Sequence, residues 1–163
     1  MKQQNQQGFT LLEMLGALII IGMMLYALTD VWQQGSRMAE QAQAAWHIKT
    51  VNDATERYIK QNYETLLSSS SASSGPQITI EDLLDADLLP EGFQDSNVWG
   101  QSYEIYIRRP QDNTLSSVIL TTGGREHEEG DSFATLSVPG AALRIGGAGG
   151  FVPTGDMAGR VFA

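Results

Sequence analysis

The chain has no cysteine among its 163 residues. This absence excludes disulfide bridges, thiolate nucleophiles and thiolate metal ligands. The two histidines stand in no pattern typical of a catalytic triad, so the sequence predicts no enzyme and no cofactor. A domain without disulfides must be held together by its hydrophobic core. The 42% hydrophobic residues suit one modest folded domain.

Basic residues are also scarce. The chain has 10 Lys and Arg residues against 19 Asp and Glu residues, which gives a net charge of −9. Proteins that bind nucleic acid need clustered Lys and Arg side chains to contact the phosphates. The composition therefore predicts no nucleic-acid partner.

Charge is nearly absent from one long stretch near the N-terminus. From Phe9 to Thr29, 21 residues carry a single charged side chain, that of Glu13. As an α-helix this stretch spans roughly 30 Å, the thickness of the hydrocarbon core of a bilayer. Lys2 precedes the run and Asp30 follows it, which predicts a cytoplasmic N-terminus and a remainder outside.

Two simple interpretations of this stretch are a cleaved secretory signal and a plain anchor. The glutamine-rich leader, the length of the run and the lack of a small-x-small cleavage site argue against a signal. A plain anchor does not explain Glu13, because an ionised carboxylate in a membrane is costly and usually has a partner or a function. Snorkelling of Glu13 to the cytoplasmic headgroups is the remaining simple alternative.

The stretch Gly8-Phe9-Thr10-Leu11-Leu12-Glu13 resembles the processing site of type IV prepilins and pseudopilins. The resemblance implies that residues 1–8 are a leader. It implies that a prepilin peptidase of the inner membrane cleaves between Gly8 and Phe9 and methylates the new amine of Phe9. It further implies that Glu13 pairs with the amine of Phe9 on a neighbouring pilin subunit during assembly. An opposite charge on the incoming subunit would relieve the cost of a carboxylate in hydrocarbon.

The apolar run is followed by a stretch that predicts a continuing, amphipathic helix. We expect one helix over residues 9–67, with residues 9–29 in the membrane or filament core and Gly35 as its weakest point. Trp32, Trp46 and His47 are interpreted as stripe or interface residues. Spacings of three or four define one apolar stripe, formed by Met38, Ala42, Ala45, Ile48, Val51, Thr55, Tyr58 and Ile59.

Serine dominates the next segment, residues 68–76, which is predicted to be a linker before a head of residues 77–145. A glycosylated serine tract is the alternative for this segment. Within the head we expect a short extended entry, a brief helix near Glu81–Ala86 and a turn at residues 90–92. The aspartates Asp85 and Asp87 are interpreted as solvated, because no nucleophile or base accompanies them.

Two strands are predicted in the head. Tyr103, Ile105 and Ile107 alternate with polar or amphipathic residues in a strand that ends at Pro110. The second strand precedes a turn at residues 123–124, and its core candidates are Leu115, Val118 and Leu120. Trp99-Gly100 is predicted to form a turn, and the Trp-Gly-x-x-Tyr pattern that begins there resembles the same superfamily. Together these features predict an α+β pilin fold, in which a long N-terminal helix packs on a small antiparallel sheet before a glycine-rich C-terminal tail.

An acidic loop is the strongest candidate for a metal site. Glu126, Glu128, Glu129 and Asp131 surround His127, and closely spaced oxygen ligands can hold calcium. The spacing of an EF-hand is missing, however, so a solvated loop is the preferred interpretation and no metal is predicted.

The tail, residues 146–163, is rich in glycine. With Leu120–Gly124 and Ile145-Gly146, it resembles the constant N-terminal region of shufflon-type minor pilins of type IVb-like, thin conjugative pili. That resemblance implies a subunit whose head lies in the periplasm before assembly and on an extracellular pilus afterwards. There it would present a tip adhesin to the recipient cell surface. The chain would then be either a truncated form of a longer protein, with the glycines as a connector, or a shorter minor pilin. A pseudopilin of a type II secretion system is the alternative function.

Overall fold

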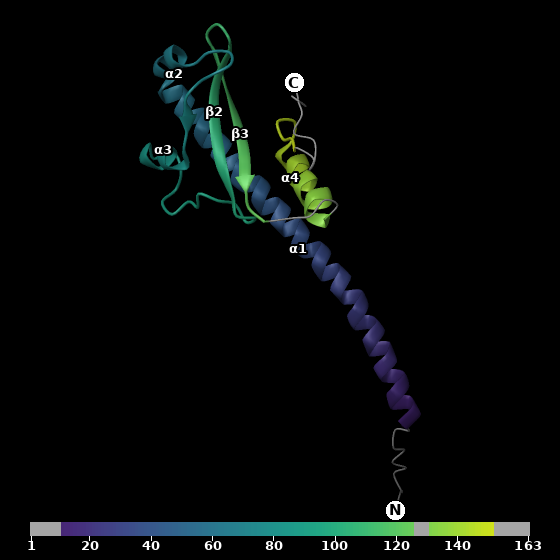
Figure 1. Cartoon of the computed structure of the whole chain (residues 1–163). Helices are drawn as coiled ribbons and strands as arrows, with labels where there is room; N and C mark the ends of the chain where they lie inside the picture. Colours follow the sequence, from purple (N-terminus) through teal and green to yellow (C-terminus); the bar gives the residue numbers. More distant parts are fainter. Residues whose placement is uncertain (1–10, 126–130, 152–163) are drawn as a thin grey trace, which may run out of the picture. The chain divides into compact units, whose positions relative to one another are not determined.

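The computed structural model describes residues 11–125 and 131–151. The described chain forms two compact units, which divide after Met38 (Figure 1). A single helix, α1 (Leu11–Gln61), belongs to both units. It is followed by α2 (Tyr63–Ser69), β1 (Gln77–Ile78), α3 (Ile80–Asp85), β2 (Gln101–Gln111), β3 (Thr114–Gly123), the π-helical turn η1 (Phe133–Ser137) and α4 (Val138–Ile145).

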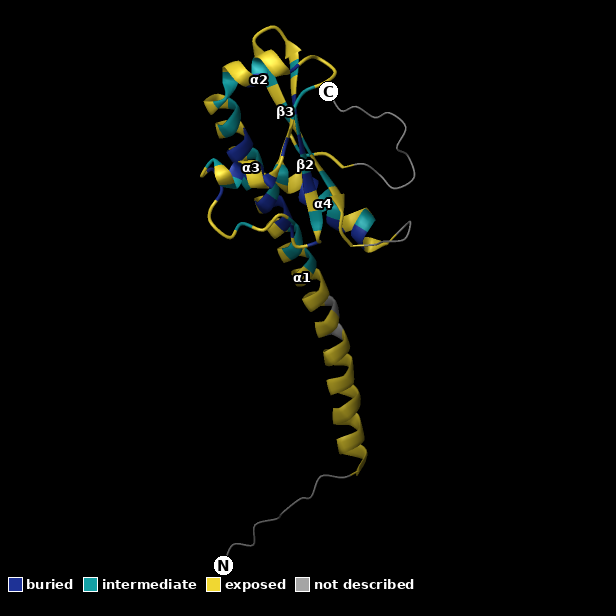
Figure 2. Cartoon of the chain, turned by 60° about the vertical axis from the view of Figure 1, so that its left-hand side comes forward, coloured by how far each residue is buried: buried dark blue, intermediate teal, exposed yellow. Residues whose placement is uncertain are grey.

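The first unit is an apolar stretch of helix, and nearly all of its described side chains are exposed. Its leucine, isoleucine and methionine side chains are exposed on every side of α1 (Figure 2). By length and composition α1 can cross a membrane, and its most apolar stretch is not buried by the rest of the described structure. This agrees with the membrane run predicted from the sequence. The predicted weak point at Gly35 is not a break, because the helix continues through it.

The second unit contains a three-stranded antiparallel sheet in the order β1-β2-β3. Central Ile105 pairs with Ile78 on one side and with Ile119 on the other. Tyr103, Ile105 and Ile107 are buried, as their alternation predicts. Strand β2 runs one residue past Pro110, which instead lies where the register with β3 shifts.

The prediction for β3 is wrong in part. Val118 and Leu120 were expected in the core, but their exposed fractions are 41% and 46%. Leu115 packs against the core as predicted, and Ile119 does so in place of Val118 and Leu120. Successive side chains of a strand point to opposite faces, so Leu115 cannot share a face with residues 118 and 120. The α+β pilin arrangement itself, a long helix packed on a small antiparallel sheet, is confirmed.

The face of α1 that packs on the sheet also differs from the predicted stripe. Val51, Thr55 and Ala45 are buried as expected, and Ile48, Tyr58 and Ile59 are partly buried. Met38 and Ala42 are exposed. The prediction missed Ala44 and Ala54, which are buried, whereas His47 is buried in line with its interpretation as a stripe or interface residue. Spacing alone allowed several neighbouring stripes, and only the position of the sheet selects one of them.

The predicted helix to residue 67 is divided at Asn62. The Asn62 side chain donates to the Tyr58 carbonyl at 3.1 Å, and α2 then starts at Tyr63. Asparagine competes with the helical backbone in this way, which weakens a helix interior. The predicted short helix near residues 81–86 is confirmed as α3, with a capping box between Thr79 and Asp82.

The serine-rich segment is attached to the sheet. The carbonyl of Ser71 accepts the Arg109 N–H at 3.0 Å, and that of Pro76 accepts the Ile107 N–H at 3.1 Å. A Cβ at Gly75 would collide with the Ile107 carbonyl, so only glycine permits this approach. Residues 71–76 therefore lie against strand β2, and the role of residues 68–76 as a linker between helix and head stays a prediction.

Buried His47 joins α1 to the rest of the head. Its Nδ1 lies 2.7 Å from the Tyr103 hydroxyl, and its ring stacks on Phe93 with 4.2 Å between centroids. Burial lowers the pKa of His47 below its ordinary value of 6.5 and raises the pKa of Tyr103 far above 10.0. His47 is thus a structural residue, in line with its interpretation from the sequence.

Replacing Ile105 by alanine should lower the free energy of unfolding of the head by about 2–5 kcal/mol, since it empties a fully buried site. Val118→Ala is the matched control on the exposed face of the neighbouring strand and should cost less than about 1 kcal/mol. Denaturant titration of the full chain in detergent measures both, followed by the change in tryptophan fluorescence to which the exposure of buried Trp99 contributes. Equal losses would contradict the assignment of the two faces.

The head should lose stability as the pH falls below 6.5. The unfolded chain then binds a proton at His47, whereas the folded chain with its lowered pKa resists it. Above pH 6.5 both states are neutral and His47 contributes no pH dependence. Thermal unfolding between pH 7.5 and 5.5 should therefore depend less on pH in His47→Gln than in the wild type, while Lys49→Gln on exposed α1 keeps the wild-type slope.

Candidate assembly site

The predicted processing site lies only partly within the described residues. Gly8 and Phe9 fall outside them, and α1 is described from Leu11 onward. Glu13 is in the first turn of α1, and its side chain is exposed. The helix dipole favours a carboxylate at this end, because the first N–H groups carry partial positive charge. The position of Glu13 therefore suits an ionised side chain that faces outward.

The surface around Glu13 is apolar. Large exposed side chains follow one another on α1 from Leu11 to Val31, with Tyr26 among them. Such a continuous apolar surface exceeds what soluble monomers expose, so it requires lipid or other protein around it. Glu13 thus lies on the surface of α1 that must be covered when the protein reaches its working environment.

The acidic loop provides no described metal site. Glu126, Glu128, Glu129 and His127 lie outside the described residues. Asp131 begins the next helical segment, because its Oδ1 accepts the Phe133 N–H at 3.4 Å and its carbonyl accepts the Thr135 N–H at 3.0 Å. Among residues 11–125 and 131–151, no group of three His, Asp or Glu residues could hold a metal ion. The calcium alternative remains untested by the structure.

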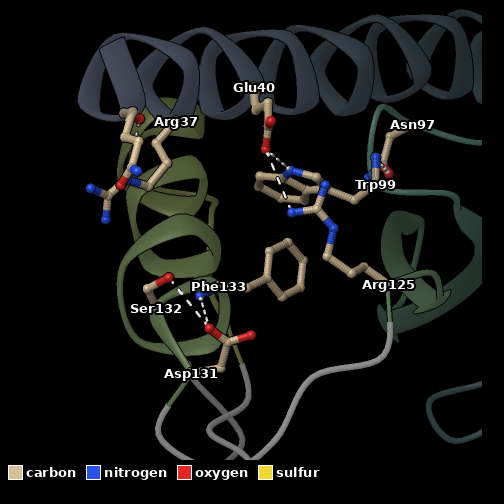
Figure 3. A network of polar contacts seen from close by, with 9 residues as sticks. Arg37, Glu40, Asn97, Trp99, Arg125, Asp131, Ser132 and Phe133 are labelled. Carbon is tan, nitrogen blue, oxygen red and sulfur yellow. Dashed lines mark hydrogen bonds and ion pairs between the residues drawn. The ribbon is translucent and has the colours of Figure 1, made fainter. Parts of the chain in front are cut away.

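A polar and aromatic cluster is centred on Trp99 (Figure 3). The Trp99 indole Nε1–H donates to Glu40 Oε2 at 3.2 Å. The Arg125 guanidinium lies 4.0 Å from the same oxygen and 5.5 Å above the Phe133 ring. Phe133 meets Trp99 edge to face with 5.1 Å between centroids. Four side chains from α1, two loops and η1 therefore meet at one place.

The backbone around Trp99 is equally well held. Asn97 Oδ1 accepts the N–H groups of Trp99 at 2.9 Å and Gln101 at 3.1 Å. Gly100 has a φ of +74°, and its N–H donates to the Asn97 carbonyl at 2.8 Å, which closes the predicted turn. These bonds fix the indole ring at the start of β2.

This cluster was missed at the level of sequence, where Trp99 was expected only in a turn. A tryptophan in a short polar loop is a usable signal, because so large a ring is rarely left in water. Nothing in the local sequence identifies its partners Glu40, Arg125 and Phe133. The segment Phe133–Ile145 was also not predicted as helix, although Pro139 near the start of α4 and Gly146 just after its end are helix boundary signals.

Two family models match the chain. A prokaryotic N-terminal methylation motif covers residues 3–28, which includes Gly8, Phe9 and Glu13. The N-terminal constant region of bacterial shufflon proteins covers residues 36–161. The chain belongs to the shufflon-type branch of the type IV pilins. The methylation motif and the helix that can cross a membrane indicate that this pilin is anchored in a membrane before it joins a pilus.

The pilin is similar to several shufflon proteins of Escherichia coli. Shufflon proteins A', C' and B are each 28% identical to it over 124 residues, or 75% of this chain. The aligned part makes up 29%, 29% and 28% of their respective lengths. The pilin thus spans less than a third of the curated relatives that it matches. No solved structure matches it.

These similarities favour a pilus subunit over the pseudopilin of a type II secretion system, since the matched family is that of shufflon proteins. The shufflon resemblance seen in the sequence is confirmed. The roles of Gly8, Phe9 and Glu13 as individual residues stay predictions.

Proposed function

We propose that this pilin is a minor subunit of a type IVb or thin conjugative pilus and that it enters the filament through α1. Its head faces the periplasm while the subunit waits in the inner membrane. The single observation that supports this most is the exposed apolar half of α1, most of which lies within the methylation motif and which carries one carboxylate at its start. In the filament, helices of other pilin subunits replace the lipid around it.

Processing by prepilin peptidase prepares the helix for that step. Cleavage between Gly8 and Phe9 creates a new amine four residues before Glu13. The amine carries a positive charge at neutral pH and retains it after a single methylation. An incoming subunit then supplies the positive partner for Glu13 of its neighbour, which offsets the cost of a carboxylate in an apolar surrounding. The pair also fixes how far one helix slides along the next.

The other end of the pilin serves contact with the recipient cell. The name of the matched family distinguishes a constant N-terminal region, and the curated relatives extend well beyond the aligned part. We therefore assign the glycine-rich residues 146–163 as a connector and the tip of the pilus as the position of the subunit. An adhesin presented there would help select the recipient in conjugation.

Loss of the Glu13 charge should reduce assembly into pili but should not reduce insertion into the membrane. Glu13→Gln and Glu13→Ala should insert at least as well as the wild type, because a charged residue in a membrane helix costs about 2.5–3.5 kcal/mol on insertion scales. Both should be cleaved, yet both should be depleted from sheared pili relative to the membrane fraction. Glu13→Asp, which keeps the charge, should restore part of the incorporation.

Met14→Ala provides the matched control for this series, since it changes an exposed apolar neighbour of Glu13 and no charge. It should join pili as the wild type does. Wild-type incorporation of Glu13→Gln would refute the pairing of Glu13 with the Phe9 amine.

Mass spectrometry of the N-terminal peptide tests the processing directly. The N-terminal peptide of the pilin from sheared pili should begin at methylated Phe9. Replacing Gly8 by leucine should leave an uncleaved precursor in the membrane, because the peptidase would no longer meet the small residue before its scissile bond. Pilus-borne protein that still carries Met1 or Lys2 is the result that contradicts this processing.

A further inference from the structure

The described residues of the head form two separate hydrophobic cores. The larger core holds the sheet, α3 and residues such as Val51 of α1. The smaller one consists of Ala44, Trp99, Phe133 and Ala141, with Val138 beside it. Phe133–Ile145, the segment formed by η1 and α4, contributes to the smaller core and to none of the buried positions of the larger one. This segment is therefore attached to the rest of the head at a site of its own.

That attachment is made largely to one turn of α1. Gln41 Nε2 donates to the Leu136 carbonyl at 3.2 Å. Gly140 lies so close to Gln41 that an added Cβ would come within 2.6 Å of its side-chain amide. Ala44 and Ala141, both small, are buried together in the smaller core. We call these contacts, with the Trp99 cluster, the clamp; it comprises Glu40, Gln41, Ala44, Trp99, Arg125, Phe133, Leu136, Gly140 and Ala141.

The clamp attaches η1 and α4, at the C-terminal end of the head, to α1, and the chain reaches these two helices from the sheet. The chain leaves β3 at Gly123, and Arg125 is pinned there by its N–H, which donates to the Trp99 carbonyl at 2.9 Å. It then reaches η1 and α4, which lie beside α1 (Figure 1). Tension applied beyond Ile145 can therefore reach α1 by two routes. One route crosses the clamp, and the other follows the covalent chain through β3.

The two routes differ in which contacts bear the tension. Within the described residues β3 pairs only with β2, so tension applied at its end, Gly123, would separate the ladder one residue pair after another. The clamp instead passes the tension to Glu40, Gln41 and Ala44, on the helix that continues into the apolar run. We propose that the clamp transmits tension from the C-terminal end of the head directly to α1 and so shields the β2–β3 hairpin. This inference rests on the proposed function, in which the C-terminal side contacts a recipient cell.

Single-molecule stretching of the full chain in detergent tests the proposal. Because the chain has no cysteine, Ala42→Cys on exposed α1 and Gly147→Cys beyond α4 give two unique attachment points. We expect two steps. Release of the clamp frees residues 125–147, at most about 80 Å of extended chain, and rupture of the sheet then frees up to about 300 Å. One rupture that releases the whole length at once would overturn the proposal.

Phe133→Ala identifies which contacts hold the first step. At constant force, it should shorten the lifetime of the clamped state about tenfold or more, or abolish the first step, and leave the second unchanged. Leu143→Ala is the matched control, since this α4 side chain is 82% exposed, and both steps should stay as in the wild type. An unchanged first step in Phe133→Ala would refute the clamp. The measurement uses isolated protein, so failure of the pilin to join pili would leave its outcome unaffected.

Discussion

The packing of one face of β2 on one face of α1 is the interaction on which the rest of the protein depends. Ile105 and Ile107 are fully buried, as are Val51 and Ala54 in the same core. No disulfide can replace this contact, since the chain has no cysteine. The head thus stays attached to its own helix through hydrophobic burial, which contributes roughly 25 cal/mol for each Å² of apolar surface removed from water.

Because α1 continues beyond that contact, one helix has to suit two environments. Between residues 40 and 59, a single face is buried and charged side chains cover much of the remainder. From Leu11 to Leu28 the large exposed side chains are apolar, so the protein alone leaves this surface unsatisfied. Lipid and then neighbouring subunits can satisfy it in turn. Glu13 is the charged residue of that stretch, and its proposed role is to bind a positive partner at the moment of assembly.

Local sequence patterns were sufficient to predict most helices and strands, but not to predict which residues pack against one another. The alternation at Tyr103, Ile105 and Ile107 fixed the buried face of β2, and the methylation motif could be recognised from Gly8 to Glu13. The prediction that Val118 rather than Ile119 is buried failed because apolar residues run consecutively there. The alternation of a strand could therefore be assigned to either face. The stripe on α1 was misplaced by a fraction of a turn, since the position of the sheet selects it. Trp99, Glu40 and Phe133 come together over long sequence separations that no local rule encodes.

The central claim is that this protein is a pilus subunit carried into the filament by α1. Its most direct test is to locate the head on intact cells. A Leu143→Cys variant gives the cysteine-free chain one exposed thiol outside α1, which can carry a gold label for electron microscopy. The account predicts gold on extracellular filaments, concentrated at their tips. Unlabelled filaments, with all of the labelled protein retained in the inner membrane, would contradict it.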